Sequence, residues 1–230
     1  MSTLYAIPTP LGGKAADALP ASALEIVRTL RNFAVENAKS ARAFLKDVGM
    51  PVPLQALSIS ELGPDLSPQM EILQQEIPLG LLSEAGCPAI ADPGAALVEA
   101  AHARGMHVVP LIGPSSIVLA LMASGLEGQR FAFCGYLPRD AGERKLRLKE
   151  LEARSRREKE TQIFIETPYR NDAMLAAILE TCGAGTKLCV ASDLTLDSQE
   201  IRTKEIKSWR AATIGKRPTV FLLNSADRQP

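Results

Sequence analysis

The residues best placed to do chemistry lie in one stretch rich in glycine and proline, LGLLSEAGCPAIADPG, residues 79–94. Leu79–Ser83 is a short apolar run typical of a buried strand, and Gly86 and Pro88 follow it closely. Because proline removes donors and glycine permits positive φ, such a loop turns sharply and exposes its amides and carbonyls. Open α/β sheets bind ligands at the carboxyl ends of strands. The stretch therefore indicates a ligand-binding loop, with a purely structural connection as the alternative.

A second candidate loop follows the next predicted strand, where Gly113 and Pro114 precede Ser115 and Ser116. An apolar helix pattern begins directly after these serines. The serines can cap that helix, or they can bind a ligand through hydroxyl and amide donors. Both interpretations remain open from the residues alone.

Several other kinds of site are disfavoured. Pro8–Lys14 lacks the GxxxxGK[ST] pattern of a phosphate loop, and no GxGxxG follows the first strand. Four cysteines form no CxxC pair, and only two histidines accompany them, so we expect free thiols and no metal site. These cysteines are Cys87, Cys134, Cys182 and Cys189.

Composition indicates a globular protein. The 230 residues are 46% hydrophobic and 23% charged, which suits one large or two small domains. A formal net charge of +0 provides no strong global field toward nucleic acid or acidic lipid. Met1–Pro10 has neither a basic start nor a long apolar core, and no apolar run approaches the roughly 18 residues of a membrane span. We therefore expect a cytoplasmic protein without a membrane partner.

Strands and helices alternate along the chain, which predicts an α/β fold. The expected strands are Thr3–Ile7, Asn32–Val35, Leu54–Ile59, Leu79–Ser83, His107–Ile112, Phe131–Tyr136, Thr161–Ile165, Lys187–Ser192, Ile201–Ile206 and Thr219–Asn224. The expected helices are Ala21–Leu30, Ala38–Asp47, Leu66–Gln75, Ala95–Arg104, Ile117–Ser124, Glu143–Glu160, Asp172–Thr181 and Ser208–Ala212. We predict that Asp92 caps the helix after the central loop, with Pro93 at its first position.

The segment Gly125–Gln129 has the character of a domain boundary. We therefore expect an N-terminal α/β domain over residues 1–124, with the Pro/Gly loop, and a C-terminal α/β domain over residues 125–230. Mixed, mostly parallel sheets are expected. The charged helix Glu143–Glu160 is predicted to present a solvated face, with an RNA-binding face as the alternative.

Six motifs in order resemble the tetrapyrrole methylase superfamily: PTPLG, SEAGCPAIADPG, GPSS, FAFCGYLPR, ETPYR and KRPTVFLLN. Members are S-adenosylmethionine-dependent methyltransferases without the Rossmann glycine fingerprint. The likeness is nearest to the ribosomal RNA small subunit methyltransferase I group, which methylates a ribose 2′-hydroxyl of 16S rRNA. It covers nearly the whole chain and implies two α/β domains, S-adenosylmethionine in a cleft between them, a homodimer, and RNA or the ribosomal subunit as partner.

The resemblance also implies the cofactor contacts. Backbone groups of a Pro/Gly loop suit the methionine amine and carboxylate, and apolar side chains suit the adenine. The implied positions are Leu11, Cys87, Ile90, Ser115, Ser116, Tyr136, Leu137, Leu194, Pro218 and Thr219.

A ribose hydroxyl must lose a proton during methyl transfer, so a general base is needed. Glu36, Glu84 and Glu166 each follow a predicted strand, and each is a candidate for this base. A helix cap or a surface carboxylate is the alternative for each of them.

The chain also departs from the group's pattern. Asn37, Ala38 and Lys39 follow Glu36 where the group has Asp-Thr-Arg, and Lys216-Arg217-Pro218 stands where Lys-Gly-Glu is usual. Two further hypotheses therefore stay open: a methyltransferase paralogue acting on a small molecule or another substrate, and a non-catalytic S-adenosylmethionine-binding protein. A nucleotide-binding α/β protein is disfavoured by the missing phosphate-loop pattern.

Overall fold

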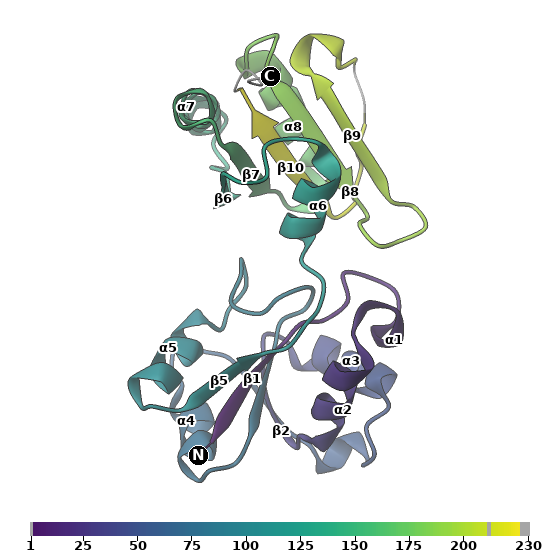
Figure 1. The fold of residues 1–230 in the computed structure, drawn as a ribbon, viewed down its shortest axis with the longest axis vertical. Coiled ribbons are helices and arrows are strands. Elements are labelled where there is room, and N and C mark those ends of the chain that lie inside the picture. The colour runs from purple at the N-terminus through teal and green to yellow at the C-terminus, as the bar shows by residue number, and fades with distance from the viewer. Residues whose placement is uncertain (1, 211–212, 226–230) are drawn as a thin grey trace. The chain divides into compact units, whose positions relative to one another are not determined.

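The computed structural model describes residues 2–210 and 213–225 and divides the chain into two compact units, residues 1–115 and 116–230 (Figure 1). Each unit is built on one five-stranded sheet with helices on both faces. The expected α/β class is confirmed for both units.

The sheet of the first unit is parallel throughout, with strand order β3-β2-β4-β1-β5. Its strands are β1 (Thr3–Ile7), β2 (Asn32–Val35), β3 (Ser58–Glu61), β4 (Leu79–Leu82) and β5 (His107–Pro110). Because every neighbouring pair is parallel, all five carboxyl ends lie at the same edge of the sheet, where the loops that follow them come together.

Two layers of helices cover this sheet. The helices are α1 (Ala15–Ala18), α2 (Ala21–Thr29), α3 (Ala38–Val48), α4 (Ser67–Gln74) and α5 (Ala95–Ala103), with a 3-10 turn η1 (Leu54–Ala56). Side chains of a strand alternate between its faces. Accordingly Ile7 and Leu82 join the core under α1, α2 and α3, whereas Leu4 and Leu81 join the core under α4 and α5.

Gly80 in β4 allows the tight packing of the first core. A Cβ at this position would lie 2.8 Å from the Cδ1 atoms of both Ile7 and Phe33, which are themselves fully buried. Only glycine therefore lets these two large side chains meet above the central strand.

The second sheet is mixed, with strand order β6-β7-β10-β8-β9. Its strands are β6 (Phe131–Tyr136), β7 (Thr161–Ile165), β8 (Lys187–Ser192), β9 (Glu200–Glu205) and β10 (Thr219–Asn224). Only β6 and β7 are parallel neighbours, whereas β10 runs antiparallel to β7 and β8, and β9 antiparallel to β8. The start of β10 therefore lies at the same edge as the ends of β6, β7 and β8.

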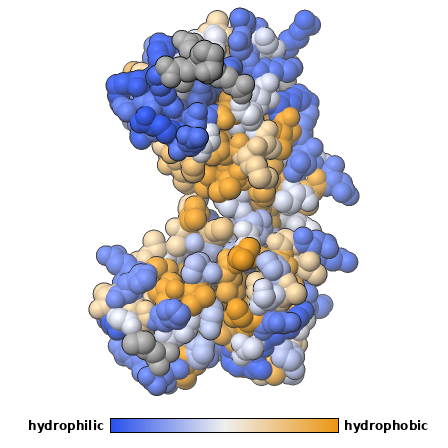
Figure 2. All heavy atoms as spheres, viewed as in Figure 1, coloured by the Kyte–Doolittle hydropathy of each residue, from blue (hydrophilic) through white to orange (hydrophobic). Residues whose placement is uncertain are grey.

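The helices of the second unit are α6 (Ser116–Ser124), α7 (Ala141–Glu158) and α8 (Asn171–Thr181), with 3-10 turns η2 (Pro168–Arg170) and η3 (Ile206–Ser208). Helices α7 and α8 bury Leu148, Leu151 and Ile178 over the stacked rings of Phe164 and Phe221, whose centroids are 5.7 Å apart. The outward side of α7 is hydrophilic, as the blue surface of Figure 2 shows.

Helix α6 packs against β8, β9 and β10. The chain therefore divides at Ser115, before α6, and not after Ser124 as the sequence suggested. The glycine-containing segment that follows the helix signalled a turn in the chain, but it could not show which sheet the helix covers.

Two expected elements differ from the structure. The strand expected at Leu54–Ile59 is the turn η1 followed by β3, because pairing of Ser58 with Asn32 of β2 sets where the strand begins. The helix expected at Ser208–Ala212 is replaced by η3, which ends at Ser208, while residues 211 and 212 lie outside the described residues.

Within the described part of the chain, no helix combines the length and apolarity required to cross a bilayer. The same residues contain no group of three or more histidine, cysteine or acidic side chains arranged to hold a metal ion.

Candidate functional site

Three loops meet at the carboxyl edge of the first sheet. Thr9, after β1, and Gly86, after β4, exchange backbone hydrogen bonds, with N···O distances of 2.8 and 3.0 Å. The Cys87 thiol donates to the Pro114 carbonyl of the loop after β5 at 3.4 Å. The loops that carry the predicted cofactor residues Leu11, Cys87 and Ser115 are therefore joined directly.

Gly86 is required by this junction. Its φ is +77°, and a Cβ there would lie 3.3 Å from Leu11 Cδ2 and 3.7 Å from the Pro114 oxygen. A side chain at position 86 would thus be strained by the positive φ and would crowd Leu11, while it would only touch the Pro114 oxygen. The residue holds the central loop against the loops on either side.

The rest of the central loop has an unusual backbone. Ala89 and Ala91 both have φ of 66°, a left-handed conformation that non-glycine residues seldom adopt. The Ala89 amide donates to the Pro93 carbonyl at 3.3 Å, which closes the loop on itself. Strained backbone of this kind concentrates at functional sites, where it aims main-chain groups at a ligand. Ile90, between the two alanines, is 49% exposed.

Glu36 links the ends of two neighbouring strands. Its carboxylate Oε2 accepts a hydrogen bond from the Glu84 amide at 3.0 Å, and its own amide donates to the Leu82 carbonyl at 3.1 Å. The first contact joins the loop after β2 to the loop after β4. Two of the three predicted base candidates are therefore brought together at this edge.

Asp92 is a member of this site that sequence reasoning missed. Burial, and secondarily the nearby carboxylates of Glu36 and Glu84, raise the pKa of Asp92 to about 6, while a hydrogen bond with Ser83 acts in the opposite direction. The residue was predicted to cap a helix, but α5 begins at Ala95 with Gly94 at the cap position. Gly94 has φ of 130°, which bends the chain so that Asp92 stays in the loop. The sequence feature that could have indicated Asp92 as a site residue is its place between Ala91 and Pro93 in the Pro/Gly loop.

The remaining predicted residues gather at one edge of the second sheet. Tyr136 and Val220 are both in register with Ile165, and Thr219 is opposite Ser192. Glu166 follows Ile165 directly. The Asp193 amide donates to the Pro218 carbonyl at 3.0 Å, which places the turn containing Leu194 beside the start of β10. This edge thus carries Tyr136, Leu137, Glu166, Leu194, Pro218 and Thr219.

These side chains differ in accessibility. Leu137, Leu194 and Thr219 are each less than a tenth exposed, whereas Tyr136 is 56% exposed. The Thr219 hydroxyl lies 2.8 Å from the Ser192 hydroxyl and donates to the Arg217 carbonyl at 2.9 Å. The buried members can therefore offer a ligand little except their main chain, while Tyr136 can offer its ring. Ser116, the first residue of α6, is partly buried.

Glu166 is enclosed by the turn that follows it, and its side chain is 1% exposed. Its Oε1 accepts from the Thr167 amide at 2.6 Å and from Arg170 Nε at 3.0 Å, and it forms an ion pair with Arg170 Nη2. The structure places this carboxylate at the expected strand end. Its hydrogen bonds are directed at the protein's own turn.

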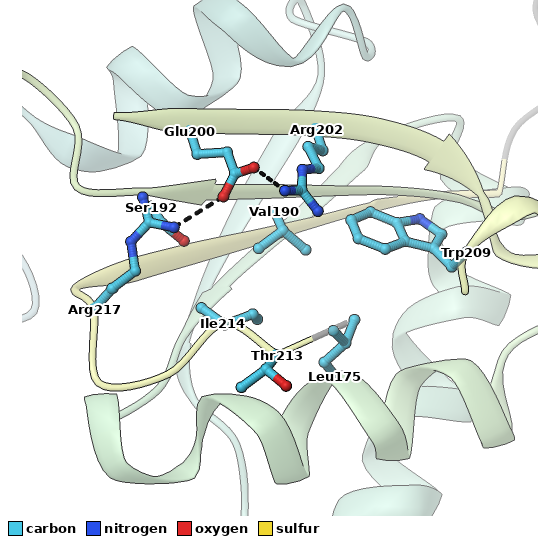
Figure 3. A pocket seen from close by; sticks show the side chains of 9 residues that line it. All are labelled: Leu175, Val190, Ser192, Glu200, Arg202, Trp209, Thr213, Ile214 and Arg217. Atoms are coloured by element: carbon cyan, nitrogen blue, oxygen red, sulfur yellow. Dashed lines mark hydrogen bonds and ion pairs between the residues drawn. The ribbon is translucent and has the colours of Figure 1, made fainter. Parts of the chain in front are cut away.

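An open hollow lies close to the same edge, between the β8–β9 ribbon and α8 (Figure 3). Arg217 bonds Asp193 Oδ2 through Nε at 2.7 Å and Glu200 Oε2 through Nη1 at 2.9 Å, and Glu200 also pairs with Arg202. The two carboxylates hold the pKa of Arg217 above its usual value. The sequence marked Arg217 as part of a motif that departs from the family pattern. It did not indicate that Arg217 fixes the turn before β10.

The edge of the first sheet offers main-chain amides and carbonyls, the Ser115 hydroxyl, the apolar side chains of Leu11 and Ile90, and a group of carboxylates. This donor set suits a ligand with charged amino-acid groups and an apolar ring system, the chemical character of S-adenosylmethionine. The described residues contain no comparable phosphate-binding sequence pattern.

The chain shares its fold with a methyltransferase of known structure. The crystal structure of the methyltransferase CobJ superposes with a TM-score of 0.62, covering 97% of this chain and 93% of that chain at 18% sequence identity. This likeness confirms the expected α/β fold class.

Sequence relatives identify the family. No protein-family model matches the chain. Ribosomal RNA small subunit methyltransferase I of Mesorhizobium japonicum is 35% identical over 208 residues, covering 89% of this chain and 68% of the relative. The protein of that name from Pseudomonas aeruginosa is 32% identical over 213 residues, covering 91% and 73%. The chain belongs to the ribosomal RNA small subunit methyltransferase I family, and the resemblance drawn from its motifs is confirmed.

Proposed function

We propose that this protein transfers a methyl group from S-adenosylmethionine to a ribose 2′-hydroxyl of 16S rRNA. The observation that carries the proposal is the agreement of relatives named for methylation of small-subunit rRNA, at 32 to 35% identity across about nine tenths of the chain. The joined loops at the carboxyl edge of the first sheet support it, because open α/β sheets bind ligands there.

S-adenosylmethionine is the proposed cofactor, and the residues proposed to contact it are those that the family resemblance implies. In the first unit Leu11, Cys87, Ile90 and Ser115 contribute, with the main chain around the positive-φ alanines available for the methionine carboxylate and ammonium. In the second unit the contributing residues are Ser116, Tyr136, Leu137, Leu194, Pro218 and Thr219. When bound, the cofactor supplies a methyl group already activated by its sulfonium, so the protein's main task is to position the acceptor.

We place removal of the ribose proton with the carboxylates at the edge of the first sheet. Glu36 and Glu84 are close enough to raise the pKa of Asp92, and a carboxylate with a pKa near 6 is a stronger base than an ordinary one while still ionised at neutral pH. Glu166 remains a predicted member of the site. Its burial and its ion pair with Arg170 favour a positioning role for it.

The finer properties of the family also enter the proposal. We propose that the protein acts as a homodimer in the cytoplasm, as the family resemblance implies.

The test of the reaction is incubation of the purified protein with small ribosomal subunits, naked 16S rRNA and radiolabelled S-adenosylmethionine. Label recovered in an alkali-resistant dinucleotide is expected, because a 2′-O-methyl group blocks strand cleavage at that ribose. Label only in other RNA or in small molecules would support a paralogue with another substrate. Cofactor binding by calorimetry without transfer to any acceptor would support a non-catalytic binding protein.

The base is tested with Glu36→Gln, Glu84→Gln, Glu166→Gln and Asp92→Asn. Loss of a general base is expected to lower turnover by about 10²- to 10⁴-fold while cofactor affinity is kept. Glu99→Gln is the matched control, because Glu99 is an exposed glutamate on α5 of the first unit. Full turnover in all four variants would contradict a carboxylate base.

A further inference from the structure

Tyr169 has a conspicuous position in the second unit. Its side chain is 80% exposed, more than any other large apolar or aromatic residue among those described. It lies in η2, directly after the carboxyl end of β7, and therefore at the edge that carries Glu166 and Thr219. The Lys216 ammonium lies 5.0 Å from the centroid of the Tyr169 ring.

Hydrogen bonds to a buried carboxylate hold the turn that presents Tyr169. Glu166, almost completely buried, accepts hydrogen bonds from Thr167 and Arg170 on either side of the tyrosine. The Arg170 amide also donates to the Thr167 carbonyl at 2.9 Å. These bonds fix the backbone on both sides of the ring. The exposed ring is therefore preorganised, which lowers the entropic cost of binding a partner.

The segment that carries Lys216 is fixed in the same way, by the start of α8. Asp172 Oδ1 accepts from the amides of Ile214 and Gly215 at 2.6 and 3.2 Å. Asn171 Nδ2 donates to the carbonyls of Gly215 and Arg217 at 3.1 and 2.7 Å. An aromatic ring and an ammonium group are thus displayed together on two constrained segments.

Charge is divided unevenly between the two units. Residues 116–230 contain 19 lysines and arginines against 15 acidic residues, a formal net charge of +4, whereas residues 1–115 contain 7 against 11, a net charge of −4. The overall value of +0 conceals this difference. An anionic polymer is therefore attracted to the unit that presents Tyr169 and Lys216.

We propose that Tyr169 and Lys216 form a binding site for one nucleotide of single-stranded RNA, with the base stacked on the tyrosine ring and its phosphate beside the lysine. Stacking on exposed aromatic rings combined with cations that follow the backbone is how proteins hold unpaired RNA. The site rests on the proposed function, since it would hold an unpaired nucleotide of the rRNA substrate. It adds a contact that positions the substrate and takes no part in the chemistry.

The test uses a fluorescein-labelled oligouridylate and 16S rRNA as probes, with affinity measured by fluorescence anisotropy. Tyr169→Ala is expected to weaken oligouridylate binding by about 5- to 100-fold, because stacking is lost. Tyr169→Phe keeps the ring and is expected to bind like wild type. Lys216→Ala is expected to reduce the salt dependence of log affinity by about 0.7.

The matched control is Lys204→Ala. Lys204 also lies over an aromatic ring, Trp209, with its ammonium 5.9 Å from the centroid, but toward the opposite end of the second sheet. This variant removes the same charge and is expected to keep the wild-type affinity. Calorimetry with S-adenosylmethionine is expected to give the wild-type value for Tyr169→Ala.

Equal oligouridylate affinity of wild type and Tyr169→Ala would overturn the site. Equal competition by polyglutamate and by RNA would also overturn it, because the surface would then select charge alone, as for an acidic protein partner. Absence of methyl transfer to rRNA by the wild type would reject the proposed function instead. The oligouridylate affinities would still decide whether the nucleotide site exists.

Discussion

The carboxylate of Glu36 accepts a hydrogen bond from the backbone amide of Glu84 at 3.0 Å. This contact joins two residues 48 positions apart and ties the loop after β2 to the loop after β4. The second of these loops contains the strained alanines and Asp92. Glu36 can therefore influence the shape of the proposed cofactor loop as well as the charge around it.

Glu36→Ala is expected to lower the affinity for S-adenosylmethionine and to lower the free energy of unfolding by about 1 kcal/mol, because the Glu84 amide loses its acceptor. Glu36→Gln keeps a side-chain oxygen that can accept the hydrogen bond from the Glu84 amide. It is therefore the control that preserves the shape of the loop after β4. Calorimetry and urea denaturation measure the two effects. Identical cofactor affinity in Glu36→Ala and wild type would show that the link does not shape the loop.

Asp92 predicts a pH dependence of stability. Its pKa of about 6 in the folded protein is above the ordinary value of 3.8, so the folded state binds this proton more tightly than the unfolded state does. The stabilisation linked to the proton is complete below about pH 4 and is lost as pH rises through 6.

Asp92→Asn is therefore expected to leave the free energy of unfolding unchanged near pH 4. At pH 7.5 the substitution is expected to raise it by about 1 kcal/mol. The effect is small because solvent screens the charge of this partly exposed side chain. Urea denaturation at a series of pH values measures the difference. A pH-independent effect of the substitution would contradict the raised pKa.

The ion pair between the buried Glu166 and the partly exposed Arg170 predicts coupling between the two residues. Glu166→Ala leaves Arg170 without its carboxylate partner and removes the acceptor of the Thr167 amide, so a loss of about 2 kcal/mol in unfolding free energy is expected. Arg170→Ala added to Glu166→Ala should cost little more, since one partner is already absent. Additive losses in this double-mutant cycle would show that the pair is not coupled.

Thiol reactivity provides a probe of the proposed cofactor loop. Burial raises the pKa of all four cysteine thiols, to about 12 for Cys182, so alkylation at pH 8 is expected to be slowest at Cys182 and Cys189, which are buried. Cys87 is partly accessible and lies in the proposed cofactor site. S-adenosylmethionine is therefore expected to slow modification of Cys87.

Cys134 is the internal control for this experiment, because it is also partly accessible but was not assigned to the cofactor site. Its rate, followed by mass spectrometry of peptides, should not change with S-adenosylmethionine. Equal protection of both cysteines would indicate a general tightening of the protein, and no protection of Cys87 would contradict its place in the site.

The sequence by itself determined most of the local structure. The strands Phe131–Tyr136, Thr161–Ile165, Lys187–Ser192 and Thr219–Asn224 agree with expectation residue by residue, because apolar runs bounded by turn residues have few alternatives. The ordered motifs also determined the family, since they lie at loops whose glycines and prolines restrict the backbone. Gly86 is an example, with its positive φ and its neighbours on two sides.

Only the tertiary structure decided which residues meet. The strand expected at Leu54–Ile59 begins at Ser58 because its partner is β2, and α6 belongs to the second unit because of the sheet it covers. Asp92 lies near the carboxylates of Glu36 and Glu84 because the helix cap is Gly94 and not Asp92. Tyr169 is exposed on a turn that hydrogen bonds to Glu166 hold in place. Such contacts depend on residues far apart in the chain, so local spacing does not specify them.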